Sequence, residues 1–170
     1  PKYGRLINYI PGGTPQIGER SFIVNVTSEW YASEKAKSAW DGQKFIVGTR
    51  VMPSGYKFPT PIVHSFDLNG NVSSGTILGD DLDYYGSLAI NCSPSGICLA
   101  IGFATGEPNG TRGGTYGRLF NSRTLTPIGN LFYLSNVPRN EDQDVIYNTK
   151  TEKFITEWMR AGWIDFRTVS

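Results

Sequence analysis

The sequence predicts an all-β fold in which about three copies of one antiparallel repeat form a single domain, residues 1–170. Frequent turns are the first observation, because the chain contains 20 Gly and 10 Pro. The second is that aromatic residues make up 13% of the chain and apolar residues come in short bursts, which favours short strands over long helices. The third is an internal repeat, and a chain of this length can bury a core around it.

The clearest repeated element is one strand together with the turn that follows it. Residues 3–8 read Tyr-Gly-Arg-Leu-Ile-Asn, and residues 116–121 read Tyr-Gly-Arg-Leu-Phe-Asn. In both copies we expect a turn that contains Pro and Gly, and after it a second apolar strand. The turns lie at residues 14–18 and 126–129, and the second strands at residues 21–26 and 131–137.

A hairpin with a polar turn is the second repeated element. Its three copies are residues 39–47, 90–101 and 146–158, in which Phe45, Cys98 and Phe154 hold equivalent positions. Two more copies of the first strand follow hairpins, at residues 62–70, where Asn-Gly is a strong turn signal, and at residues 164–168. We therefore expect a period of about 50 residues. The approximate repeats are 3–61, 62–115 and 116–163, with a partial strand copy at 164–170.

An apolar hairpin such as residues 147–158, combined with a strand such as Tyr-Gly-Arg-Leu and a Gly-marked turn, resembles the blade repeats of secreted β-propeller proteins. The resemblance covers most of the chain and implies four-stranded antiparallel repeats. The chain departs from that family in number, because a closed propeller usually has at least about four blades. The expected architecture is therefore propeller-like or a β-sandwich, and one version is a partial ring that other chains complete.

The spacing of the two cysteines indicates the cellular compartment of the protein. Cys92 and Cys98 flank Ser-Pro-Ser-Gly, a turn sequence that would bring the two sulfurs together across a hairpin. We predict a cross-strand disulfide, and the alternative is a pair of free thiols in the core of a cytosolic protein. Four Asn-X-Ser/Thr sequons occur, and Pro94 makes the one at Asn91 a poor acceptor of glycan. The other three, at Asn25, Asn71 and Asn109, add to the disulfide in favouring an extracellular or cell-surface glycoprotein.

Charge and hydropathy argue against two classes of partner. The chain has 16 basic and 15 acidic residues, and the basic residues form no cluster of the kind that nucleic acid requires. No apolar stretch reaches about 18 residues, so we expect no membrane-spanning helix. The prediction is a protein with neither a nucleic-acid partner nor a membrane span.

The sequence also predicts that the protein is not an enzyme. His64 is the only His, and its place in a predicted strand favours an ordinary structural residue over a general base. No nucleophile elbow and no phosphate-binding Gly motif occurs. Asp80, Asp81 and Asp83 are interpreted as a solvated loop, while a calcium site and a glycosidase pair with carboxylates of residues 141–144 are the alternatives. The sequence predicts no cofactor, with calcium as the one alternative.

The predicted function is a structural or adhesive subunit that associates with copies of itself. The chain begins and ends with a copy of the same strand, and exposed strand edges pair readily. Contacts of that head-to-tail kind give rings when they close and filaments when they do not. The residues expected in the assembly strands are Tyr3, Gly4, Arg5, Leu6, Ile164 and Phe166.

The alternative function is a multivalent glycan-binding module of the propeller-lectin type. Aromatic faces near predicted loops would bind the apolar faces of sugars, and repetition would raise avidity. The candidate residues for this role are Trp30, Tyr31, Tyr84 and Tyr85. Trp40 and Trp158 lie inside the repeated hairpins, so we expect them in the core.

Overall fold

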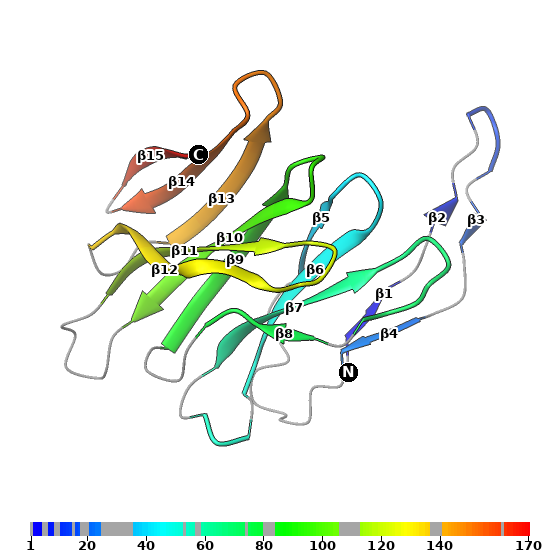
Figure 1. The fold of residues 1–170 in the computed structure, drawn as a ribbon, viewed down its shortest axis with the longest axis horizontal. Coiled ribbons are helices and arrows are strands. Elements are labelled where there is room, and N and C mark those ends of the chain that lie inside the picture. The colour runs from blue at the N-terminus through cyan, green and yellow to red at the C-terminus, as the bar shows by residue number, and fades with distance from the viewer. Residues whose placement is uncertain are drawn as a thin grey trace.

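A computed structural model describes the β-sheets of the chain (Figure 1). The residues that it describes are 2–4, 7–8, 11–14, 16–17, 21–24, 36–52, 54–56, 59–73, 75–79, 84–105, 113–136, 141–160 and 162–170. Every regular element among these residues is a strand. The all-β prediction is therefore confirmed.

Three antiparallel sheets follow one another along the chain, each a simple meander. The first sheet contains β5 (Lys37–Trp40), β6 (Phe45–Val51), β7 (Thr60–Phe66) and β8 (Thr76–Ile77). The middle sheet contains β9 (Tyr84–Cys92), β10 (Ile97–Thr105), β11 (Gly113–Asn121) and β12 (Pro127–Ser135). The third sheet contains β13 (Glu141–Asn148), β14 (Lys153–Arg160) and β15 (Trp163–Val169).

Two short ladders form a hairpin at the start of the chain, here called the N-terminal hairpin. It pairs β1 (Lys2–Gly4) with β4 (Ser21–Val24), and β2 (Ile7–Asn8) with β3 (Gln16–Ile17). Figure 1 shows β2 and β3 projecting away from the three larger sheets, on the side opposite to β15. A two-stranded hairpin is marginally stable by itself in water.

The predicted hairpins exist because polar side chains close their turns. Asn148 accepts hydrogen bonds at its Oδ1 from the backbone N–H groups of Lys150 (2.9 Å) and Thr151 (3.1 Å). Asp41 and Asn121 make the same pair of contacts in the β5–β6 and β11–β12 turns. Asp and Asn favour turns because their side chains replace part of the backbone hydrogen bonding there.

The predicted turn at residues 126–129 is wrong in its position. Because Asn121 caps the preceding segment, the chain already reverses before Thr126, whose backbone O accepts from Asn121 N (2.9 Å). Pro127 then begins β12, and Gly129 (φ 65°) lies within that strand, where the register with β11 shifts. Gly in the left-handed region is typical of such a bulge.

The repeated sequence corresponds to a three-stranded unit of each sheet. Each predicted hairpin is followed by a third strand, β7, β11 or β15, that pairs with the second strand of the hairpin. In the Tyr-Gly-Arg-Leu strand, Gly117 lies opposite Phe132 on β12, and a Cβ at Gly117 would lie 2.7 Å from that ring. The glycine thus leaves room for an aromatic ring over the strand.

Successive side chains along the strands of the middle sheet point to opposite faces, and they form two hydrophobic cores, one on each face. Leu88, Ile90 and Cys92 pack in one cluster with the first-sheet residues Ala39, Ile46 and Val63. On the other face, Ala89, Leu99 and Ile101 pack with the third-sheet residues Val145, Phe154 and Trp158. The middle sheet is therefore covered on both faces, by a different sheet on each.

Two side-chain hydrogen bonds also join the sheets. Ser122, in the β11–β12 turn, donates from Oγ to Oδ2 of the buried Asp41 (2.5 Å), which lies in the β5–β6 turn. On the other face of the middle sheet, Ser87 of β9 donates to Oε1 of Gln143 on β13. Both contacts link residues far apart in sequence, so they depend on the stacking of the sheets.

Candidate functional site

The outer edge of β15 is the first feature that can support a function. β15 pairs with β14 over its whole length, from Phe154↔Val169 to Arg160↔Trp163, without a register shift. It contains no proline, and no described strand pairs with its other edge. An edge of this kind presents unpaired N–H and C=O groups to another chain.

Other sheet edges in the described part of the chain carry the usual protection against such pairing. β12 contains Pro127 and two register shifts, and the pairings of β9 and β13 with their neighbours contain one register shift each. β8 is two residues long and β5 is four. Short, bulged and proline-containing edges resist addition of a further strand. β15 is the long regular edge in this set.

The third sheet also has an exposed apolar face. Cross-strand partners lie on the same face of a sheet, and the pair Met159↔Ile164 therefore lies on the face opposite the buried Phe154 and Trp158. We call this surface the outer apolar patch. Its members, with their exposed fractions, are Ile146 (54%), Met159 (37%), Ile164 (62%) and Phe166 (62%).

Two large aromatic residues outside the outer apolar patch are also exposed. Trp163 is 73% exposed and Trp40, on β5, is 43% exposed. The prediction that Trp40 lies in the core is wrong because of this exposure, although its ring contacts Phe45 at a centroid distance of 4.8 Å. Trp158 is 3% exposed and belongs to the core, as predicted.

The predicted N-terminal assembly strand is only partly described. Tyr3 and Gly4 lie in β1, where Tyr3 pairs with Phe22 and Gly4 with Ser21. Arg5 and Leu6 lie outside the described residues. The predicted C-terminal residues Ile164 and Phe166 are both in β15 and in the outer apolar patch.

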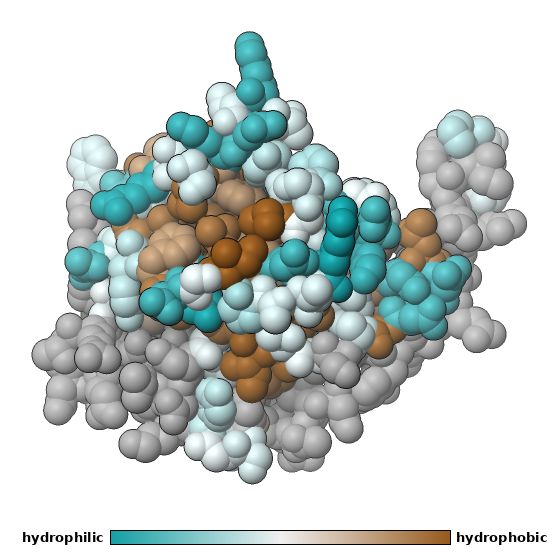
Figure 2. All heavy atoms as spheres, viewed as in Figure 1, coloured by the Kyte–Doolittle hydropathy of each residue, from teal (hydrophilic) through white to brown (hydrophobic). Residues whose placement is uncertain are grey.

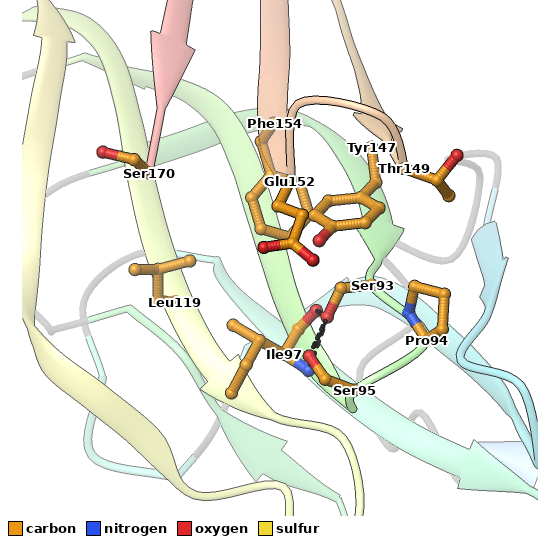
Figure 3. Close-up of a pocket in the computed structure, with 10 residues that line it drawn as sticks. All are labelled: Ser93, Pro94, Ser95, Ile97, Leu119, Tyr147, Thr149, Glu152, Phe154 and Ser170. Carbon is orange, nitrogen blue, oxygen red and sulfur yellow. Dashed lines mark hydrogen bonds between the residues drawn. The ribbon is translucent and has the colours of Figure 1, made fainter.

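A pocket of about 530 Å³ is the second feature, and it lies between the β9–β10 turn and the β13–β14 turn. Both turns point to the upper side of Figure 1. Figure 2 shows brown spheres gathered over the upper half of the visible face, with teal spheres around them. The residues that line the pocket are Ser93, Pro94, Ser95, Ile97, Leu119, Tyr147, Thr149, Glu152, Phe154 and Ser170 (Figure 3).

Apolar side chains form the pocket walls, and polar groups gather at its centre. Figure 3 shows the Tyr147 hydroxyl and the Glu152 carboxylate turned toward the space in front of Ser93. The Tyr147 ring meets Phe154 edge-on at a centroid distance of 5.0 Å. Ser93 Oγ donates to the Ile97 backbone O (3.0 Å) and lies 2.8 Å from Ser95 Oγ.

The disulfide that holds one wall of this pocket is present as predicted. Cys92 and Cys98 lie directly opposite each other on β9 and β10, with their sulfurs 2.03 Å apart. Both cysteines are buried in the core between the first and middle sheets. The bond closes the turn that carries Ser93 and Ser95.

One of the three predicted glycosylation sites is described. Asn71 is exposed, and its Nδ2 donates to Oδ2 of Asp67 (2.9 Å). The hydrogen bond from the Asn71 side chain, with further bonds from backbone N–H groups, lowers the pKa of Asp67. Asn25 and Asn109 lie outside the described residues.

Most of the predicted glycan and calcium residues fall outside the description. Asp80, Asp81 and Asp83 belong to that group, as do Trp30 and Tyr31. Within the described ranges, no group of three or more His, Cys, Asp and Glu side chains could hold a metal ion. Tyr84 and Tyr85 begin β9, and the description does not extend to their side chains.

His64 is a buried residue of β7, as the strand interpretation predicts. Its Nδ1 lies 3.2 Å from the backbone O of Ser73, and the side chain is 8% exposed. The pocket residues Glu152, Tyr147 and Ser93 were not predicted, because two turns more than fifty residues apart in sequence form that site. The one local signal for this pocket in the sequence is a charged residue, Glu152, at the last position of a tight turn.

No family model, curated protein or solved structure matches this chain. Among the described residues, no helix is both long and apolar enough to cross a membrane.

Proposed function

We propose that this chain is a non-enzymatic extracellular structural or adhesive subunit that associates with copies of itself through its terminal β-strands. The observation that carries the proposal is the third sheet, which presents a long edge without proline or a register shift and an apolar outer face. Exposed apolar surface of this kind marks interaction sites in soluble proteins. The disulfide is compatible with an oxidising, extracellular location.

A second copy of the chain is the partner that fits this surface best. The middle sheet has a neighbouring sheet on each face, whereas the third sheet has one on its inner face and the exposed outer apolar patch on the other. A further sheet of the same meander type would continue the stack. The N-terminal hairpin of the next copy would then supply the strand that pairs with β15.

The placement of the two ends favours head-to-tail contacts. Figure 1 draws β15 and the β2–β3 ladder on opposite sides of the molecule. A contact that joins two different surfaces repeats from copy to copy, and it closes into a ring or continues as a filament. A structural coat, a fibre and a ring are all consistent with this arrangement.

The test is the native mass of the intact protein, measured by light scattering over a range of concentrations, with negative-stain imaging of the same sample. We expect rings or filaments. The double variant Ile164→Lys/Phe166→Lys places two charges on the edge and on the outer apolar patch, and we expect it to stay monomeric. Ile128→Lys is the matched control, because Ile128 is an exposed apolar residue (39%) on β12 of the middle sheet.

Deletion of residues 1–8 tests the other half of the contact. It removes β1 and β2 and should abolish association while the three larger sheets stay folded. Association that survives both the deletion and the double variant would contradict strand completion. A compact monomer at every concentration would contradict self-association itself.

A glycan-binding module is the second candidate function. The pocket between the β9–β10 and β13–β14 turns favours it, because that pocket combines an aromatic ring with a carboxylate and hydroxyl groups. The two functions use different surfaces and can occur in one protein.

A further inference from the structure

In the turn at residues 149–152, a charged residue has an unfavourable backbone conformation. Glu152 has φ of 54°, in the left-handed region that disfavours residues with a Cβ. In the β9–β10 turn the corresponding place is taken by Gly96, with φ of 87°. A glycine would relieve the same strain in the β13–β14 turn.

Packing or a register shift accounts for the two other described non-glycine residues with positive φ. Asp142 (φ 49°) lies where the register of β13 with β14 shifts. Leu125 also has a positive φ, 58°, in the β11–β12 turn, and its side chain is buried in the core beside Phe120. Glu152 is exposed and lines the pocket instead. Strained backbone that no packing explains is typical of functional sites.

We propose that the pocket between the β9–β10 and β13–β14 turns binds a neutral saccharide, with Glu152 and Tyr147 as its main hydrogen-bonding groups, an inference that rests on the glycan-binding candidate function. An aromatic ring and aliphatic walls suit the C–H face of a sugar ring. An ionised carboxylate accepts hydrogen bonds only, whereas the Tyr, Ser and Thr hydroxyls both donate and accept. This combination matches the many hydroxyl groups of a saccharide.

The charge of the lining selects against other ligands. Glu152 is the one charged side chain among the ten residues that line the pocket, and no lysine or arginine lines it. Phosphate, sulfate and acidic sugars would therefore meet a carboxylate without a compensating cation. The volume, about 530 Å³, lies in the range of about 300–1,000 Å³ that small-ligand sites occupy.

The pocket is also built from fixed parts. The disulfide between Cys92 and Cys98 closes the turn that forms one wall, and Ser93 accepts at Oγ from Ile97 N (3.1 Å). The other wall carries the Tyr147–Phe154 ring pair. Preformed walls lower the entropy lost on binding.

The experiment starts with the intact protein on an array of neutral and anionic glycans, followed by calorimetric titration of the neutral saccharide that binds best. We expect Glu152→Gln and Tyr147→Phe each to weaken binding at least tenfold. Glu157→Gln is the matched control, because Glu157 lies on the opposite face of β14, paired with Phe166. That control should bind the saccharide like the unmodified protein.

Glu152→Gly separates binding from folding. It should abolish saccharide binding and raise the midpoint of thermal unfolding, because glycine tolerates the positive φ. Retention of anionic glycans alone, or no retention of any neutral glycan, would overturn the proposal. Unchanged affinity in Glu152→Gln and Glu152→Gly would overturn it as well. The native mass should be unaffected by Glu152→Gln, Glu152→Gly and Tyr147→Phe, which keeps this site distinct from the assembly edge.

Discussion

Asp41 connects the first and middle sheets through one buried carboxylate. Burial, at 4% exposure, acts to raise the pKa of Asp41. The hydrogen bond from Ser122, two backbone N–H groups and the charge of Lys44 act in the opposite direction, and the net effect is a pKa below its usual value. The folded protein therefore favours the ionised carboxylate.

The variant Asp41→Asn should lower the free energy of unfolding at pH 7 by about 1–3 kcal/mol, because it leaves buried hydrogen-bond donors with a weaker acceptor. The folded-state pKa is depressed, so the stability that the carboxylate confers is complete above its unfolded pKa of about 4. That stability is lost as the pH falls through the lower folded-state pKa. The difference between the two proteins should therefore shrink below about pH 4.

Urea unfolding at pH 7 and pH 3 measures this difference. Asp142→Asn is the control, since Asp142 is exposed and asparagine tolerates its positive φ of 49°. The control should leave stability nearly unchanged at either pH. A gap between Asp41→Asn and the unmodified protein that stays constant from pH 7 to pH 3 would show that the carboxylate charge is irrelevant to the contact.

Single residues also show where sequence reasoning succeeds. The Cys92–Cys98 bond was predictable because the two cysteines flank a turn within one hairpin, and the distance between them depends only on local geometry. The Asp41–Ser122 contact was not predictable, because the two residues meet only when two sheets stack. Glu152 was not predicted for the same reason, because its pocket forms only when the β9–β10 turn lies beside the β13–β14 turn.

The β9–β10 hairpin is the element that the disulfide stabilises. The bond links residues six apart in sequence, so it restricts a short loop in the unfolded chain. The chain-entropy model gives about 2 kcal/mol for a loop of this size. We expect the double variant Cys92→Ala/Cys98→Ala to lose about that amount, measured by urea unfolding.

Reduction provides the matched control for this element. A reductant should destabilise the unmodified protein by a similar amount and leave the double variant unaffected. An unmodified protein that keeps its full stability after reduction would show that packing alone holds the hairpin. The test also reports on the pocket, because Ser93 follows Cys92 directly.

At the level of strands, the sequence predicted the hairpins well and their ends less well. Apolar segments on both sides of a polar turn are local signals, and they located β5–β6, β9–β10 and β13–β14. The position of the β11–β12 turn was missed because Pro127 and Gly129 suggested it more strongly than Asn121. Side-chain capping decided the outcome, and Pro127 became the first residue of a strand.

Over the whole molecule, the repeats predicted about three antiparallel units of four strands each. The first and middle sheets have the four strands that were expected, and the third has three among the described residues. How the sheets stack was beyond the sequence, because both cores draw on the middle sheet and alternation alone does not say which sheet covers which face. The approximate repeat boundaries and the self-association itself stay predictions.

A sheet enclosed on both faces shields its backbone differently from a sheet enclosed on one. The amide hydrogens of β10, in the interior of the middle sheet, should exchange with deuterium most slowly of all the strands. The amides of β15 that point away from β14 should exchange quickly in dilute solution. Hydrogen–deuterium exchange followed by mass spectrometry, on the intact protein at low and high concentration, measures both.

If copies associate as proposed, the β15 amides should gain protection as the concentration rises, and those of β10 should not change. Exchange of β15 that is the same at every concentration, in a sample that forms oligomers, would place the contact on another surface. Because the middle sheet is covered on both faces, the slow exchange of the β10 amides serves as an internal reference. The change in exchange of the β15 amides on association can then be measured relative to the β10 amides of the same protein.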